Sequence, residues 1–155
     1  MSVSIVRFAS LLLMSLLVGT MFGVWLGFNP SGLTAATYVE MQQNAILALN
    51  TTLPALGGAC ILLTATLAVL TRHDRRARYL LIAAAALLVT AGLVTRFANQ
   101  PINAQVMTWS AQAPPGNWME LRDTWWHWHV LRTAAGMGAL VLALVAALGR
   151  QSHAS

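Results

Sequence analysis

Residues 121–149 read LRDTWWHWHVLRTAAGMGALVLALVAALG, a polar and aromatic start that runs into a long apolar stretch. If this stretch is helical, spacings of three and four residues place five side chains on one face: Arg122, Trp125, His129, Arg132 and Gly136. Charged groups and a histidine near lipid cost free energy unless they are paired or used. The stretch therefore predicts a membrane-spanning helix whose first third carries a functional cluster.

The composition of the whole chain agrees with a membrane protein. Of 155 residues, 57% are apolar and only 8% are charged, whereas a soluble domain carries about 25% charged residues. Four stretches reach the roughly 20 apolar residues that span a bilayer: residues 8–28, 51–71, 79–98 and 130–149. We expect one domain of residues 1–155, all-α, folded as an integral membrane antiparallel four-helix bundle.

The first span is expected to be a retained helix and not a cleaved signal peptide. Its apolar run is longer than a usual signal-peptide core, and no clear A-x-A cleavage site follows it. Glycines recur every four residues at Gly19, Gly23 and Gly27, a spacing that suits close helix packing in lipid. This stripe permits a homo-oligomer without requiring one.

Arginine placement predicts the orientation, because the sequence contains no lysine. One side of the membrane holds Arg7, the basic segment 72–78 and Arg150, while the formal charges on the other side cancel. The positive-inside rule then places both termini in the cytoplasm, and we expect the inner membrane of a bacterium. The sequence pI of 11.2 follows from the same arginines, which we interpret as a topology signal with some attraction to anionic lipid and not as a nucleic-acid site.

Two segments on the outer side are expected to be structured and helical. Residues 31–50 are helix-prone and continue into the second span, with a bend expected near Pro54. On this segment Gln42 and Asn44 are assigned to a solvated face. Glu40 is the only acid before the cytoplasmic loop and is a candidate for the site.

In the second outer segment, Pro101 either ends the third span or starts a short helix, where its missing N–H is harmless. Asn99 is then expected to cap that helix, which leaves Asn103 free to face a site. Residues 114–116, Pro-Pro-Gly, force a break. The pair of residues Asn117 and Glu120 resembles a capping box and predicts the start of a long fourth helix at about residue 117.

No metal or cofactor is predicted from the residues. On a helix, His127 and His129 point about 200° apart, so they do not readily chelate one metal. A copper site with Met107 or Met119 is kept as an alternative. Haem is another alternative, but the remaining histidines, His73 and His153, are expected on the cytoplasmic side. The single cysteine, Cys60, excludes an internal disulfide and a thiolate metal cluster.

The chain resembles the anthrone-oxygenase-like family of small four-span membrane proteins, long catalogued as a domain of unknown function. The resemblance rests on Asn99-x-Pro101-x-Asn103, then Trp109, then Arg122-x-x-x-Trp126-x-x-His129-x-x-Arg132. It extends to the four-span layout, the glycine-rich first span ending at Pro30 and the stretch 38–43, so it covers nearly the whole chain. Trp125, His127 and Trp128 lie outside the pattern.

The resemblance implies oxidation of a hydrophobic phenolic or anthrone-type aromatic molecule by O₂ to a quinone, without an obvious organic cofactor. Histidine is suited to remove an acidic C–H proton near neutral pH, and arginine or asparagine donors stabilise the resulting oxyanion. The expected catalytic residues are His129, Arg132 and Arg122. The expected substrate-binding residues are Asn99, Asn103, Trp109, Trp126, Arg96 and Glu40.

Two other classes of function fit the same residues. The first is a non-enzymatic membrane protein, which binds a small molecule or serves as an accessory subunit through an exposed Trp/His/Arg face. The second is a metal- or haem-dependent redox protein that uses the outer cluster, with His127 and His129 as metal ligands. The enzyme interpretation predicts instead that the cluster lines a cavity between helices.

Overall fold

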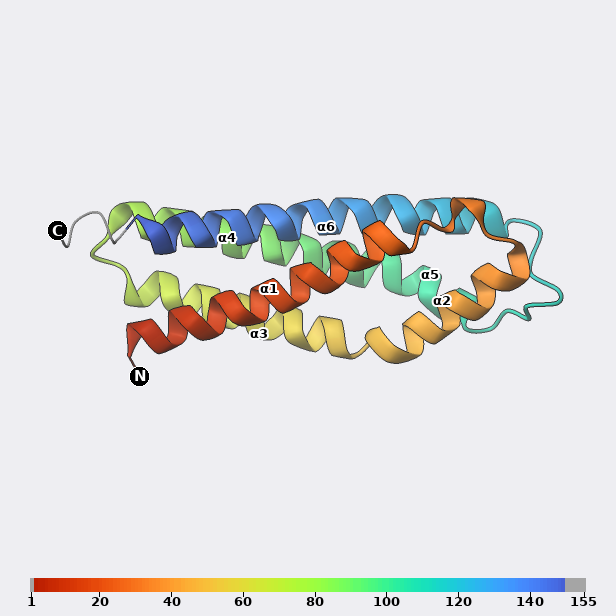
Figure 1. Cartoon of the computed structure of the whole chain (residues 1–155), viewed down its shortest axis with the longest axis horizontal. Helices are drawn as coiled ribbons and strands as arrows, with labels where there is room; N and C mark the ends of the chain where they lie inside the picture. The colour runs from red at the N-terminus through yellow and green to blue at the C-terminus, as the bar shows by residue number, and fades with distance from the viewer. Residues whose placement is uncertain (1, 150–155) are drawn as a thin grey trace.

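The computed structural model describes residues 2–149. Four long helices lie along the long axis of the molecule (Figure 1): α1 (Val3–Gly27), α3 (Thr52–Leu70), α4 (Arg75–Val94) and α6 (Trp118–Leu148). By length and composition each could cross a membrane. α1 packs against α3 and α6, α4 packs against the same two helices, and neighbours run in opposite directions. The predicted all-α antiparallel bundle is confirmed.

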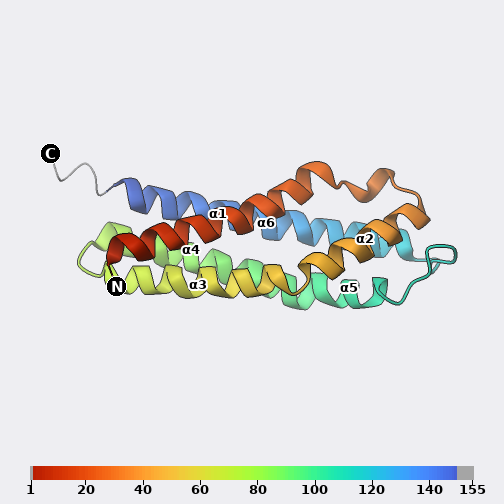
Figure 2. The same ribbon diagram turned by 60° about the horizontal axis from the view of Figure 1, so that its bottom comes forward.

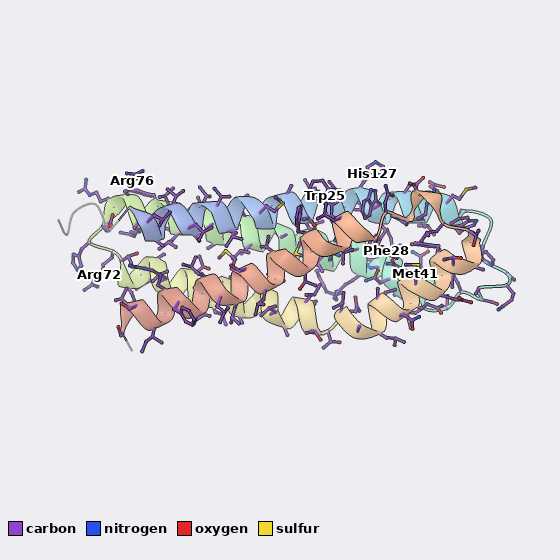
Figure 3. All side chains as sticks on the ribbon, in the orientation of Figure 1. Trp25, Phe28, Met41, Arg72, Arg76 and His127 are labelled. Carbon is purple, nitrogen blue, oxygen red and sulfur yellow. The ribbon has the colours of Figure 1, made fainter. Side chains whose placement is uncertain are left out.

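The two ends of the bundle differ. One end holds the start of α1, the α3–α4 turn and the end of α6. The other end, here called the outer end, holds the short helices η1 (Pro30–Gly32), α2 (Ala35–Leu49) and α5 (Gln100–Val106) (Figures 1 and 2). The expected structured outer segments are therefore present. The opposite end carries the arginine-rich turn, where Figure 3 labels Arg72 and Arg76; Arg150 lies outside the described residues.

The close helix packing expected of the α1 glycine stripe occurs on another helix. A Cβ added at Gly19, Gly23 or Gly27 would meet nothing within 4 Å, so this stripe packs against no other helix in residues 2–149. On α6, a Cβ at Gly136 would lie 3.3 Å from Val18, and one at Gly138 would lie 3.2 Å from Leu87. α6 therefore provides the close approach.

The expected bend near Pro54 lies earlier in the chain. α2 ends at Leu49 and α3 begins at Thr52, so the helix is interrupted at Asn50 and Thr51. Pro54 sits in the first turn of α3, where a helix has no intrahelical partner for the backbone N–H, and it does not bend the helix.

Two predicted helix caps are wrong. The chain passes from α4 through a π-helical turn, η2 (Thr95–Asn99), directly into α5, and Asn99 makes no capping bond. Its side-chain amide donates instead to the backbone carbonyl of Trp125, at 3.0 Å. Asn117 precedes α6 with φ −95° and ψ 15°, not with the extended backbone that a capping side chain needs, and it caps nothing.

The apolar core divides into two parts. The inner core joins α1, α3, α4 and α6, and its α6 members are Ala139, Ala143 and Ala146. The smaller outer core consists of the buried residues Ile46, Ile102, Val106 and Trp125. The candidate site lies beside the outer core.

Candidate functional site

A cavity of about 400 Å³ lies in the outer half of the bundle, a volume within the roughly 300–1,000 Å³ of small-molecule sites. α1 contributes an apolar wall of Met21, Val24 and Phe28. Figure 3 shows Phe28 and Met41 in this outer half. The polar residues that line the cavity come from α2 to α6: Gln42, Asn44, Asn50, Thr95, Asn103, His129 and Arg132.

His129 is held rigidly in the wall of this cavity. Its side chain is buried and stacks on Trp125 at 5.2 Å with parallel rings, and on Trp126 at 5.6 Å. Nε2 lies 3.2 Å from the carbonyl oxygen of Met21, and Nδ1 lies 3.0 Å from a guanidinium nitrogen of Arg132. Because a guanidinium only donates, Nδ1 is the acceptor and Nε2 carries the proton given to Met21. This pattern selects the neutral imidazole.

Arg132 reaches the cavity from the next turn of α6. Its Nε and one terminal nitrogen contact Nδ1 of His129 at 3.3 and 3.0 Å, and Nη1 donates to the hydroxyl of Thr95 at 3.2 Å. The guanidinium also lies 5.8 Å from the centre of the Trp125 ring. No carboxylate forms an ion pair with it in residues 2–149. A buried cation without a counter-ion favours an anionic group in the adjoining cavity.

Asn103 joins three helices beside the cavity. Its Oδ1 accepts from the indole N–H of Trp125 at 2.8 Å and from the amide of Gln42 at 3.4 Å. Its amide nitrogen donates to Oδ1 of Asn50 at 2.9 Å. The expectation that Asn103 faces a site agrees with this position.

One buried acceptor in the cavity has no partner. Oε1 of Gln42 makes no hydrogen bond, although the side chain is only 1% exposed. Leaving a buried polar atom unpaired costs about 1–3 kcal/mol. Oε1 of Gln42 is therefore available to a donor on a bound molecule. Tyr38, one turn earlier on α2, is also buried; burial raises the pKa of its phenol, which stays neutral.

Arg122 does not join His129 and Arg132, although all three share one helix face. It lies two turns of α6, about 10 Å, from His129 and does not line the cavity. Its Nε donates to Asp123 at 2.8 Å, and its guanidinium covers the ring of Trp118 at 5.1 Å. Its Nη1 donates to the backbone carbonyl of Ser31 in η1 at 3.5 Å, so Arg122 connects the start of α6 to η1.

Two more expected residues lie away from the cavity. Glu40 is exposed because it is two residues from both Tyr38 and Gln42, about 200° around α2. Arg96 is exposed on the α4 side, where it donates to Gln100 at 3.4 Å. Neither residue lines the cavity that contains His129.

The remaining expected residues, Asn99, Trp109 and Trp126, do not line the cavity but pack next to it. Asn99 holds the backbone of Trp125, and Trp109 packs on the outer core. Trp126 stacks on His129 without lining the cavity. The lining indole belongs to Trp125, which lies outside the sequence pattern.

The structure does not bring together the ligands of the copper alternative. His127 is exposed and points away from the bundle (Figure 3), whereas His129 is buried. Met107 and Met119 are exposed as well. Within residues 2–149 no three His, Cys, Asp or Glu side chains form a metal-binding group. His73 of the haem alternative lies at the opposite end, and His153 is outside the described residues.

The assignment of Gln42 to a solvated face is wrong, because its side chain is buried and lines the cavity, and sequence reasoning missed Asn50 and Thr95. A signal for Gln42 and Asn50 existed, because residues 38, 42, 46 and 50 are spaced four apart and share one helix face. Tyr38, Gln42 and Ile46 on this face are all buried. Thr95 had no such signal, since its position depends on the π-helical turn.

The position of the site along the membrane normal follows from helix length. From His129 to Leu148, α6 rises about 29 Å at roughly 1.5 Å per residue. The hydrocarbon core of a bilayer is roughly 30 Å thick. If Leu148 lies near one boundary of the core, His129 lies near the other. The cavity is then close to the outer interface.

The fold and the site define a small membrane protein of four spans, with an aromatic-walled cavity that contains an arginine and a histidine. The family model described as anthrone oxygenase matches residues 43–142, which is more than half of the chain. The chain therefore belongs to the anthrone oxygenase family, as its sequence pattern suggested. The comparisons with curated proteins and with solved structures find no match.

Proposed function

We propose that the protein oxidises a hydrophobic phenolic ring system of the anthrone type with O₂, inside the outer cavity. The observation that carries the proposal is Arg132, a cation that has no carboxylate partner among residues 2–149 and that contacts His129 in the wall of this cavity. Family membership supports the oxygenase chemistry. The apolar wall suits an aromatic molecule that dissolves in the membrane.

The cavity offers matching groups to such a substrate. The aromatic body packs against Phe28, Met21 and Trp125. A phenolic O–H donates to the unpaired Oε1 of Gln42. The ring carbonyl accepts from Arg132, whose planar fork of donors suits an oxygen that gains negative charge.

Binding of that carbonyl also makes a base available. In the structure, the lone pair of Nδ1 on His129 accepts from Arg132. When the guanidinium turns to the substrate oxygen, this lone pair is free to take a proton from the CH₂ group between the rings. The resulting enolate is stabilised by Arg132.

Oxidation then balances with O₂ as the only oxidant. The carbanion gives electrons to O₂ and forms a C–O bond, which yields a hydroperoxide after protonation. Loss of the second C–H proton and cleavage of the O–O bond produce the quinone carbonyl and one molecule of water. The CH₂ carbon is oxidised, and one oxygen atom of O₂ stays in the product.

The decisive experiment measures O₂ uptake and quinone formation by purified protein in lipid nanodiscs with an anthrone-type substrate. With ¹⁸O₂ we expect one labelled oxygen in the quinone and an unchanged rate after chelator treatment. A rate no faster than spontaneous oxidation contradicts the proposal. Loss of activity on chelation that returns with one metal would favour the metal-dependent alternative. Tight binding without turnover would favour the non-enzymatic alternative.

The proposal places the cavity on the outer face of a bacterial inner membrane, with both termini in the cytoplasm. A Cys60→Ala background removes the native thiol, and single cysteines at the exposed positions His73 and Gly116 then mark the two ends. We expect an impermeant thiol reagent to label Gly116→Cys in intact cells and to leave His73→Cys unlabelled. The reverse pattern would invert the topology.

A further inference from the structure

A second cavity, of about 240 Å³, lies between α1, α3, α4 and α6. Its inner part is lined by apolar side chains and glycines, such as Leu17, Ile61 and Leu88. Its polar residues are Thr95 and Arg96 of η2, Gln100 at the start of α5 and Arg132 near the middle of α6. The function proposed above does not use this space.

The second cavity adjoins the first. Both are lined by Met21, Leu53, Pro54, Thr95 and Arg132. The two spaces therefore share a wall formed by these five side chains. A molecule that passes Arg132 and Thr95 from the second cavity arrives at the side of the substrate cavity that holds His129.

The second cavity reaches the surface of the bundle at two glycines. Gly58 on α3 and Gly92 on α4 line it, and both are exposed. A Cβ added at either position would meet no atom within 4 Å. Both glycines lie in helices that could cross the membrane, so the opening faces the hydrocarbon.

Size and lining select a small apolar occupant. The volume is below the roughly 300–1,000 Å³ of typical ligand sites, whereas that of the first cavity is within this range. An apolar cavity of about 150 Å³ stays dry and binds xenon in another protein. The groups suited to a phenolic substrate, Gln42 and His129, line only the first cavity.

We infer that the second cavity takes up O₂ from the bilayer and delivers it past Arg132 and Thr95 to the substrate. O₂ is small and apolar, and it is more soluble in hydrocarbon than in water. The inference rests on the proposed oxygenase function, because O₂ is the co-substrate of that reaction. O₂ then reaches the reaction site through the second cavity, whereas the aromatic substrate binds in the first cavity.

Filling the opening tests the inference. Gly58→Leu and Gly92→Leu place a side chain in the second cavity, while Gly19→Leu and Gly23→Leu place the same side chain at exposed α1 positions outside both cavities. We expect the first pair to lower kcat/KM for O₂ several-fold, with the KM for the aromatic substrate and the rate at saturating O₂ unchanged. The α1 variants should behave as the unmodified protein.

Xenon gives a readout that does not depend on catalysis. Crystals or ¹²⁹Xe spectra of the unmodified protein should show xenon in the second cavity, and Gly58→Leu with Gly92→Leu should remove it. If xenon is lost and the O₂ dependence stays unchanged, the delivery role is wrong. A rise only in the KM for the aromatic substrate overturns it too, since the cavity would then admit that molecule. Absence of turnover in the unmodified protein is distinct, because it removes the proposed function itself.

Discussion

The two halves of α6 bury different kinds of residue on the same face. The outer half buries Arg122, Trp125 and His129, whereas the inner half buries Gly136, Ala139, Ala143 and Ala146. Small residues let neighbouring helices approach closely in a membrane. Large polar and aromatic residues hold the helices apart and surround a cavity. One continuous helix thus combines a close-packed inner half with a hollow outer half.

The neighbouring helices change at the same level. Along the inner half of α6, α4 is a regular helix that buries Ala77, Leu81 and Ala84. Along the outer half, the chain turns through η2, where Asn99 bonds to the backbone of Trp125. Single π-helical turns occur frequently at functional sites. We therefore predict that substitutions in the outer half of the bundle affect catalysis and that substitutions in the inner half affect stability.

The largest effect is expected for His129→Ala. Removing the proposed base should lower the rate at least about 10²-fold, which is the low end for a positioned general base. O₂ uptake measures the loss, and thermal unfolding checks that the variant is folded. A folded variant that keeps its full rate would assign His129 to structure alone.

Arg132→Lys should produce the next largest loss, about tenfold or more, equivalent to roughly 1.4 kcal/mol. An ammonium group cannot contact His129, Thr95 and the face of Trp125 together as the guanidinium does. Steady-state kinetics with the aromatic substrate would show it. Full activity of the lysine variant would mean that the charge alone is sufficient.

The inner half should respond in stability instead. Ala139 is fully buried between helices, and Ala139→Leu adds volume where none is free. Overpacking of this kind costs about 1–3 kcal/mol of unfolding free energy. We expect a lower midpoint of unfolding in detergent with an unchanged rate per folded molecule. A loss of rate without a loss of stability would show that the two halves are coupled.

The smallest effect is expected for His127→Ala. This side chain is exposed and points away from the cavity, and surface substitutions of this kind change stability by less than about 0.5 kcal/mol. The rate and the unfolding midpoint should match those of the unmodified protein. An effect equal to that of His129→Ala would instead support a metal held by both histidines.

Much of this contrast could be predicted from the sequence, because hydrophobicity and helical periodicity determine it. The four spans and the buried face of α6 follow from such local patterns. Asn103 was expected at a site because Asn99 was expected to cap α5, and Asn99 makes no capping bond. The meeting of Gln42 and Asn103 does not follow from local patterns, since it depends on how α2 folds back on α5. Arg122 was expected beside His129 but does not line the cavity, because residues that share a helix face can still lie two turns apart along the axis. Trp126 was taken from the family pattern, whereas the indole that lines the cavity belongs to Trp125, which helical spacing places on the face of His129.

The residues that line the substrate cavity fall into two groups, one inside and one outside the range matched by the family model. Asn50, Asn103, His129 and Arg132 all lie within the matched range of residues 43–142. Met21, Val24 and Phe28, which form the apolar wall beside His129 and Trp125, precede that range, as does Gln42. We expect substitutions in this wall of the first helix to change substrate preference, because the groups proposed to handle protons and negative charge lie on α6. We expect exchange of this helix for that of another family member to change which aromatic molecule the cavity accepts.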